Sequence, residues 1–433
     1  MRSDQKQPNI WKGMLVGLIA GLVASWTMDR FQDVWIAVSP PEDSKKKEGQ
    51  ARASEDGEEG QDEATVNAAS AISERLFEHK LTRSEKKIAG PAVHYAVGAT
   101  SGINMGTGYR TWKSEVSTID TAFLIAGALT AAQYFNRDTS NEREIRNLAD
   151  ELYRRADWQW AQHGALTISH GWKPETGFIK YRWTGYSEAL ILYILALASP
   201  TFPISPESYR AWTRTYKWKD LYGFQHLYAG PLFIHQLSHM WIDFRGIQDE
   251  YMKSKAIDYF ENTRRATYAQ QQYAIRNPKR FKGYSEHIWG ITASDGPGPA
   301  TRHIRGRTLR FYDYRGRGIP FGPDDGTLAP WAMIASLPFA PEIVLPSLHY
   351  FNQQFPEMTS KYGFKCSYNP TFADSKTEKK GWVSLGYYGL DQGPIVAMIE
   401  NYRTGFLWRL MRKCPYIIEG LRRAGFDGGW LGS

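Results

Sequence analysis

Three acidic residues each open a strongly apolar stretch of helical character, and aromatic side chains lie near them in the chain. They are Asp120 in residues 117–122, Glu188 in residues 183–188 and Asp391 in residues 387–394. Carboxyl groups held together in this way are suited to breaking a glycosidic bond, because one acid can protonate the leaving oxygen while another activates water or attacks. Aromatic rings offer flat apolar faces to sugar rings.

The elements that must position these acids are predicted to be helices. Apolar periodicity indicates helices over 119–135, 142–162, 189–198, 206–212, 231–244, 254–276, 328–340, 342–353 and 394–411. Wholly apolar segments alternate with amphipathic ones, and strand alternation is sparse. This pattern predicts an all-α helical barrel, with apolar helices inside a ring of amphipathic helices.

Such a barrel has a geometric consequence for the acids. Its inner helices run parallel, so their N-termini meet at one end, where Asp120, Glu188 and Asp391 should converge. Helix N-termini favour anions and lower a carboxyl pKa, which suits a base or a nucleophile. A general acid needs the opposite shift, which burial against aromatic rings would supply. The candidate rings are Trp183, Tyr186 and Trp289.

Composition agrees with a sugar-binding cleft. The 433 residues include 16 Trp and 25 Tyr, and the formal net charge of +8 is dispersed along the folded part. The densest basic run is Arg302, Arg305, Arg307, Arg310, Arg315 and Arg317. We expect a surface loop there, or contacts to an anionic or hydroxyl-rich ligand, in preference to nucleic acid. Cys366 and Cys414 form no disulfide framework.

One spacing is also compatible with a metal site. His235, His239 and Asp243 recur every four residues. No further ligand cluster accompanies them, so we favour a core His235 and a hydrogen-bonded His239 in the cleft, with no metal. Serine or cysteine nucleophile arrangements and a phosphate-binding glycine loop are not evident, and no cofactor is expected.

The N-terminal region has a different character. Residues 13–28 are uncharged and mostly apolar, which predicts a membrane anchor, and a cleaved signal peptide is the alternative. Residues 40–64 are charged and should be disordered. Basic residues before the first span put the following domain outside the cytoplasm, whereas a second span at 88–105 would return it.

Seven ordered motifs resemble one family. They are KSEVSTIDTA (113–122), WTGYSE (183–188), LYAGPL (227–232), QLSH (236–239), YFEN (259–262), WGITASDG (289–296) and GYYGLD (386–391). This set resembles the bacterial glucoamylase-like glycoside hydrolases that include endo-β-1,2-glucanases, from about residue 111 to the end. The resemblance implies an (α/α)6 toroid barrel and hydrolysis of a β-glucan, with β-1,2 linkage and inversion as the specific expectation.

The resemblance also assigns residues. Glu188 matches the general acid and Asp391 matches the base. The residues expected to bind substrate are Glu115, Asp120, Trp183, Tyr186, His239, Glu286, Trp289, Asp295 and Tyr387. Trp183 and Trp289 are the rings that we expect to stack on sugars.

One departure concerns the start of the barrel. In the family, three or four barrel helices precede the KSE segment, and here they are absent. Residues 11–107 instead resemble a family of small bacterial inner-membrane proteins, in the segments WKGM (11–14), LVAS (22–25) and AGPAVHY (89–95). We therefore expect a membrane-anchor region over 1–107 and an N-terminally truncated catalytic domain over 108–433, joined by a fusion or a gene-model error.

Three functional hypotheses follow. The first is a β-glucan hydrolase anchored in the bacterial inner membrane, with its catalytic domain in the periplasm. The second is an inactive glucan-binding or membrane-associated remnant, because the barrel is incomplete. A phosphorylase or transglycosylase on the same fold is a weaker third hypothesis, which phosphate dependence of cleavage would reveal.

Overall fold

The computed structural model describes residues 113–304, 306–360, 362–372 and 381–432. The chain consists of two compact units, and the boundary between them lies between Ala156 and Asp157. The predicted anchor at 13–28, the charged tract at 40–64 and the second apolar stretch at 88–105 lie outside the described residues. Within the described ranges, no helix combines the length and the apolar character needed to cross a membrane.

The described part of the first unit is a helical hairpin. Strand β1 (Val116–Ser117) leads into α4 (Thr118–Tyr134), and α5 (Ser140–Arg154) packs on α4. The N-cap of α4 is Ser117, because its hydroxyl accepts the N–H of Asp120 at 3.3 Å. Asp120 therefore lies in the first turn of α4.

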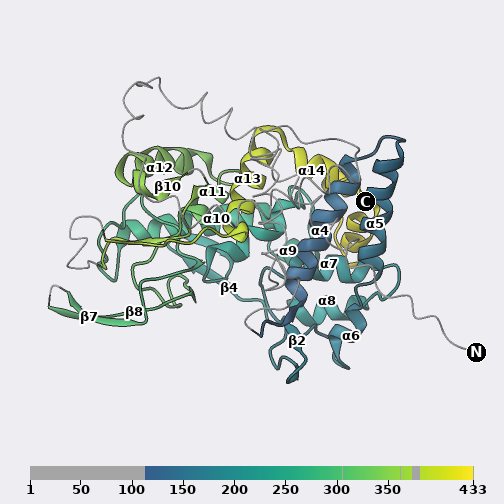
Figure 1. Ribbon diagram of the computed structural model, residues 1–433, viewed down its shortest axis with the longest axis horizontal. Helices are drawn as coiled ribbons and strands as arrows, with labels where there is room; N and C mark the ends of the chain where they lie inside the picture. Colours follow the sequence, from purple (N-terminus) through teal and green to yellow (C-terminus); the bar gives the residue numbers. More distant parts are fainter. Residues whose placement is uncertain (1–112, 305, 361, 373–380, 433) are drawn as a thin grey trace, which may run out of the picture. The chain divides into compact units, whose positions relative to one another are not determined.

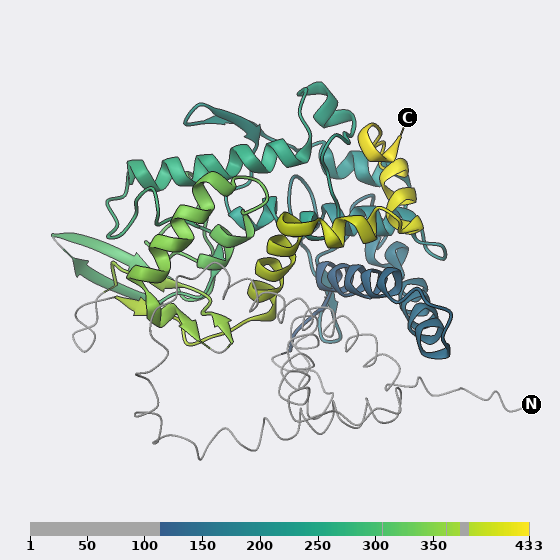
Figure 2. The same ribbon diagram turned by 90° about the horizontal axis from the view of Figure 1, so that it is seen from above.

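The second unit is mainly helical (Figure 1). Its core includes α7 (Leu190–Ala198), whose residues are all buried, and α15 (Pro415–Arg423), which packs on α7. Figure 2 shows the long α10 (Tyr259–Arg276) alongside α12 (Pro341–Gln354), and Arg264 of α10 pairs with Glu342 of α12 at 2.9 Å. The remaining helices are α6 (Trp158–Gln162), α8 (Pro206–Thr213), α9 (Glu250–Ser254), α11 (Pro330–Ala335), α13 (Gly389–Thr404), α14 (Phe406–Met411), η3 (Pro356–Met358) and η4 (Gly429–Leu431).

Short antiparallel pairs of strands occupy many of the connections. The pairs are β2 (Gly171–Lys173) with β3 (Gly177–Phe178), β4 (Trp218–Leu221) with β5 (Phe224–Leu227), β6 (Ala293–Ser294) with β9 (Arg315–Gly316), β7 (Ala300–Ile304) with β8 (Arg307–Phe311), β10 (Thr359–Ser360) with β11 (Gly363–Phe364), and β12 (Tyr368–Asn369) with β13 (Trp382–Val383). The β7–β8 hairpin projects from the rest of its unit (Figure 1). It carries part of the arginine-rich run, and the expected surface position is correct for Arg302 and Arg310 but wrong for Arg317, which is fully buried.

The predicted helix over 231–244 is wrong. This segment forms two 3-10 helices, η1 (Leu232–His235) and η2 (Leu237–Met240). Its buried polar side chains bond to other elements: Gln236 Nε2 donates to the carbonyl oxygen of Ala332 at 2.6 Å. The residues of this segment are therefore not all apolar core residues. Its buried polar side chains make tertiary hydrogen bonds, which apolar periodicity does not describe.

Two long predicted helices, over 142–162 and 394–411, are each divided in two, and the one predicted over 254–276 begins only at Tyr259. Asp157 accepts the N–H of Trp160 at 2.7 Å and starts α6, and Asp258 similarly accepts the N–H of Glu261 and starts α10. Gly405, with φ +66°, separates α13 from α14. Helix α13 begins at Gly389 and not at Pro394, so that Asp391 belongs to its first turn.

Candidate active site

The site begins where two short strands stop. Strands β6 and β9 pair Ala293 with Gly316 and Ser294 with Arg315, so Asp295 and Tyr314 follow as the next opposed positions. Asp295 Oδ2 accepts hydrogen bonds from Ser384 Oγ at 3.0 Å and from Tyr388 Oη at 2.8 Å. The Asp295 carboxylate is thus held by a residue that follows β13 and by the N-cap of α13.

The Asp391 carboxyl is buried in the first turn of α13. The residue is 6% exposed, and its backbone N–H donates to the carbonyl oxygen of Tyr388 at 2.9 Å. Among the described residues, Asp391 Oδ2 finds no hydrogen-bond partner. Burial, together with the charge of Asp295, raises the pKa of Asp391 to about 7 against the opposing effect of a hydrogen bond with Cys366. This carboxyl can therefore exchange a proton near neutral pH.

Cys366 lies between the Asp295 backbone and the Asp391 carboxyl. The residue is 2% exposed; its sulfur is hydrogen-bonded both to the backbone of Asp295 and to the side chain of Asp391. Burial and the charge of Asp391 raise the pKa of the thiol. The thiol is therefore protonated at neutral pH and donates to the Asp391 carboxylate.

Glu188 lies immediately before α7 and is half-buried. Its carbonyl oxygen accepts a hydrogen bond from Ser238 Oγ at 3.2 Å, and the same hydroxyl accepts the N–H of Ile191 at 3.1 Å. The N-cap residue of α7, Ala189, has no side chain that could cap the helix. Ser238 of η2 supplies the cap and fixes the backbone that carries Glu188.

The acidic groups of the site lie near the hydroxyl of Tyr314. Tyr314 is 63% exposed, yet desolvation of its hydroxyl and then the charges of nearby acidic groups, among them Asp391, Glu188 and Asp295, raise its pKa to about 12. Because Coulomb interactions decay with distance, these three carboxyl groups lie near one phenol. The second unit thus brings Glu188, Asp295 and Asp391 together.

This arrangement can perform acid–base chemistry on a polyhydroxylated ligand. Three carboxyl groups supply proton donors and acceptors, and partly exposed rings are adjacent to them. Tyr314 is 63% exposed and Tyr388 is 43% exposed, so each has a ring face available to a sugar. Within the described ranges, no group of three or more His, Cys, Asp or Glu side chains is placed to hold a metal ion.

Several predicted binding residues of the second unit have their rings packed against other protein groups. Trp289 is 1% exposed, and its indole N–H donates to Ser347 Oγ at 3.0 Å. Trp183 is 8% exposed and stacks on His170, with 3.8 Å between ring centroids. Tyr186 stacks on Tyr259. Since protein neighbours occupy these rings, the structure does not place Trp183 and Trp289 for the sugar stacking that we expected.

His239 also lies in the core and not in a cleft. It is 2% exposed, packs edge-on to Phe244 and Phe339, and its Nε2 lies 3.0 Å from Thr263 Oγ1. Burial lowers its pKa to about 3, so the imidazole is neutral. Its partners make it a structural residue.

Four further predicted binding residues are Glu286 and Tyr387 of the second unit and Asp120 and Glu115 of the first. Glu286 is exposed, with its Oε1 3.4 Å from His287 Nε2, and Tyr387 packs edge-on to Tyr362. Asp120 and Glu115 are in the first unit, where burial, and to a smaller extent the charge of Glu115, raise the pKa of Asp120.

The sequence did not point to four residues of this site. Tyr314 and Tyr388 each lie in an aromatic segment, Tyr-Asp-Tyr at 312–314 and Tyr-Tyr at 387–388, and this was a usable signal. Ser384 and Cys366 carry no local signal. Their roles arise from the pairing of segments that are far apart in the chain.

Comparison with known proteins decides the family. The sequence model of the Glycoamylase family, described as "Putative glucoamylase", matches residues 180–415. The chain belongs to this family. The matched residues include Glu188, Asp295, Tyr314, Cys366 and Asp391, so the acidic site lies within the Glycoamylase region.

Individual relatives of this Glycoamylase chain are named for glucan hydrolysis. A Parabacteroides distasonis protein named exo beta-1,2-glucooligosaccharide sophorohydrolase (non-reducing end) is 30% identical over 334 residues. That match covers 70% of this chain but 43% of the relative, so the chain spans less than half of the relative's length.

Solved structures support the same family and a mainly helical fold. A Bacteroides uniformis protein described as a putative glucoamylase has a TM-score of 0.67 and 31% identity, covering 86% of this chain and 89% of its own. An endo-beta-1,2-glucanase from Chitinophaga pinensis, in complex with sophorotriose and glucose, has a TM-score of 0.67 and 27% identity, covering 86% and 88%.

Proposed function

We propose that this protein hydrolyses β-1,2-linked glucan, with Glu188 as general acid and Asp391 as general base. The observation that carries the proposal is the gathering of Glu188, Asp295 and Asp391 around the Tyr314 hydroxyl. Names of relatives supply the substrate class, since one is a sophorohydrolase and another is an endo-β-1,2-glucanase.

In the proposed reaction, Glu188 transfers its proton to the glycosidic oxygen as the bond to the anomeric carbon breaks. Asp391 takes a proton from a water molecule, which attacks the anomeric carbon from the opposite face and inverts its configuration. Asp391 is suited to this role because burial and the nearby Asp295 charge raise its pKa to about 7, which increases its affinity for the water proton.

We propose internal cleavage of the chain. The relatives differ on this point, because the Parabacteroides distasonis protein is named as an exo-enzyme and the Chitinophaga pinensis protein as an endo-enzyme. Our proposal follows the motif resemblance. The time course of products separates the two modes: an endo-enzyme releases a range of oligosaccharides early, whereas an exo-enzyme releases one short product throughout.

For the architecture, we propose an (α/α)6 toroid, and a membrane anchor in residues 1–107. Wholly buried α7 supports an inner-ring position, and amphipathic α15 packed on it supports an outer-ring position. For localisation, we propose the bacterial inner membrane with the catalytic domain in the periplasm. The apolar run at 13–28, preceded by basic residues, supports this assignment.

The alternative is an inactive glucan-binding or membrane-associated remnant, and one experiment distinguishes it from an enzyme. The full chain, purified in detergent, is incubated with linear β-1,2-glucan beside Glu188→Gln, and products are resolved by chromatography. We expect oligosaccharides from the wild type and a loss of at least about 10³-fold in kcat from Glu188→Gln, as for removal of a general acid.

The matched control is Glu207→Gln, which neutralises an exposed glutamate of α8 paired with Arg210. It should retain wild-type turnover. A folded wild type that binds the glucan without cleaving it would overturn the hydrolase proposal in favour of the remnant. Cleavage only in the presence of inorganic phosphate would instead indicate a phosphorylase.

A further inference from the structure

Beneath the candidate site, one arginine is completely buried together with its partner acid. Arg317 and Asp325 both have side chains that are 0% exposed, and Arg317 Nε lies 2.7 Å from Asp325 Oδ1. We propose that Arg317 is a positioning residue, which holds Asp295 and Tyr314 in register at the active site through the backbones of their neighbours. This inference rests on the proposed function only for its effect on turnover.

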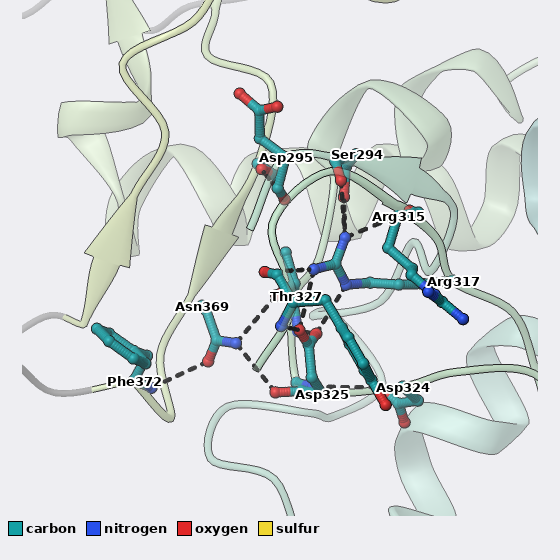
Figure 3. A network of polar contacts seen from close by, with 12 residues as sticks. Ser294, Asp295, Arg315, Arg317, Asp324, Asp325, Thr327, Asn369 and Phe372 are labelled. Carbon is teal, nitrogen blue, oxygen red and sulfur yellow. Dashed lines mark hydrogen bonds and ion pairs between the residues drawn. The ribbon is translucent and has the colours of Figure 1, made fainter. Parts of the chain in front are cut away.

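The guanidinium bonds to both segments that enter the site (Figure 3). Nη1 donates to the carbonyl oxygen of Ser294 at 2.7 Å, directly before Asp295. Nη1 and Nη2 also donate to the carbonyl oxygens of the residues around Tyr314, which are Tyr312 at 3.2 Å, Asp313 at 3.1 Å and Arg315 at 3.3 Å. One rigid planar group thus joins the two segments.

The short strands alone would hold this geometry weakly. Only two residue pairs connect β6 with β9, and Asp295 and Tyr314 lie just beyond the last pair. A two-residue ladder is only marginally stable without further support. The Arg317 side chain supplies this support from beneath, by bonding to both partners at the end of the ladder.

Asp325 in turn is fixed by its own hydrogen bonds. Its Oδ2 accepts the N–H of Tyr312 at 2.9 Å and Arg317 Nη2 at 2.9 Å, and its Oδ1 accepts the N–H of Thr327 at 3.1 Å. Burial opposes its ionisation, but the hydrogen bonds and charge of Arg317 outweigh burial and lower the pKa of Asp325. Asp325 therefore stays ionised and orients the guanidinium.

Gly296 leaves the space that the guanidinium occupies. A Cβ at this position would collide with Arg317 Nη2 and with the carbonyl oxygen of Tyr312. Glycine is therefore required directly after Asp295, so that the arginine can approach. Alanine at 296 would therefore displace the guanidinium together with the backbone of Tyr312.

The energetics favour a role beyond stability. Burying an ion pair costs desolvation that its Coulomb attraction often fails to recover, and apolar replacements are frequently as stable. The Arg317–Asp325 pair instead orients the backbone around the site. The guanidinium N–H groups donate to Ser294, to the 312–315 segment and to Asp325. Lysine retains the charge but offers one nitrogen instead of a planar fork.

The test compares Arg317→Lys with the wild-type full chain by hydrogen–deuterium exchange without substrate. We expect at least about ten-fold faster exchange in peptides covering 293–296 and 312–316, as a loosened segment opens more often. On linear β-1,2-glucan we expect kcat to fall at least ten-fold with KM changed less than three-fold. If Arg317→Lys does not fold, Asp325→Asn, which removes the carboxylate that orients the guanidinium, provides the same comparison.

The matched control is Arg412→Lys, which alters another arginine paired with a buried carboxylate, Asp243. It should lower the melting temperature without changing exchange in the two peptides or turnover. The positioning role would be overturned if the two peptides exchanged in Arg317→Lys at the wild-type rate. A kcat loss in Arg317→Lys no larger than that of Arg412→Lys would also overturn it. A wild type without turnover would refute the hydrolase function but not the positioning role of Arg317, because exchange is measured without substrate.

Discussion

At the scale of single residues, Asp391 combines properties that disfavour folding and suit catalysis. Its carboxyl is buried, and its Oδ2 finds no hydrogen-bond partner among the described residues. A buried, incompletely bonded carboxyl destabilises the fold, and such groups concentrate at functional sites. Asp295 increases this cost, because its charge further raises the pKa of Asp391.

Replacement by the uncharged isostere should therefore separate stability from activity. We expect Asp391→Asn to lose at least about 10³-fold in kcat, as for removal of a general base, and to become more stable than wild type above pH 7. The pKa of the carboxyl rises from 3.8 unfolded to about 7 folded, so the wild type loses stability as pH rises through this window. The loss is at most about 4 kcal/mol at 1.36 kcal/mol per pKa unit.

Denaturant unfolding at pH 4 and pH 8 measures this difference. The advantage of Asp391→Asn over wild type should be small at pH 4 and full at pH 8. Equal differences at both values would contradict the raised pKa. The pH profile of kcat/KM tests the role itself: a base gives activity that rises through about pH 7, whereas activity that falls there would make Asp391 the acid.

At the scale of elements, the sequence predicted helices well where apolar periodicity alone decides them. Segment 189–198 is predicted within one residue of α7, and 206–212 within one residue of α8. The prediction failed over 231–244, where Gln236, Ser238 and His239 are buried through bonds to distant elements. No local pattern specifies such tertiary partners, because they come from segments far away in the chain.

The same limit applies to the candidate site. Glu188, Asp295 and Asp391 could be predicted because each lies in a motif that contains aromatic residues and glycine. Carboxyl groups are unusual in segments that are otherwise expected to be buried. Tyr314 and Arg317 could not be predicted, because their roles depend on the pairing of β9 with β6, which lies about twenty residues earlier. The arginine-rich composition instead suggested a surface segment, and only the folded contacts of Arg317 distinguish it from its exposed neighbours.

The capping of α7 leads to a prediction at this scale. Ser238→Ala removes the hydroxyl that bonds to the Glu188 carbonyl oxygen and to the Ile191 N–H. We expect a loss of about 1–2 kcal/mol in the free energy of unfolding, as for loss of a helix cap. Because the backbone of the proposed acid is no longer fixed, kcat should also fall about ten-fold, measured on linear β-1,2-glucan.

Ser336→Ala is the matched control. The Ser336 hydroxyl is also buried and makes two hydrogen bonds, accepting from Gln236 Nε2 and donating to the carbonyl oxygen of Ala332, and neither bond reaches the Glu188 segment. Its loss of stability should be similar, with turnover unchanged. Equal kcat values for the two variants would show that the Ser238 cap stabilises α7 without positioning Glu188.

At the scale of the whole molecule, the acids predicted from the sequence belong to two different units. Glu188, Asp295 and Asp391 belong to residues 157–433, together with every residue that contacts them in the site described above. Asp120 and Glu115, which we expect to bind substrate, belong to the first unit. If the first unit contributes to substrate binding, its acids should affect affinity for the glucan more than they affect the chemical step.

Asp120→Asn tests this contribution. Asparagine keeps the shape of the side chain and the backbone N–H that Ser117 caps, and it removes a charge whose burial raises the pKa of Asp120. Stability should therefore be retained, while KM for linear β-1,2-glucan rises about ten-fold, which corresponds to loss of about 1.4 kcal/mol of binding. Glu144→Gln, an exposed glutamate of α5, is the control in the same unit and should leave KM unchanged. An unchanged KM in Asp120→Asn would remove Asp120 from the substrate-binding residues.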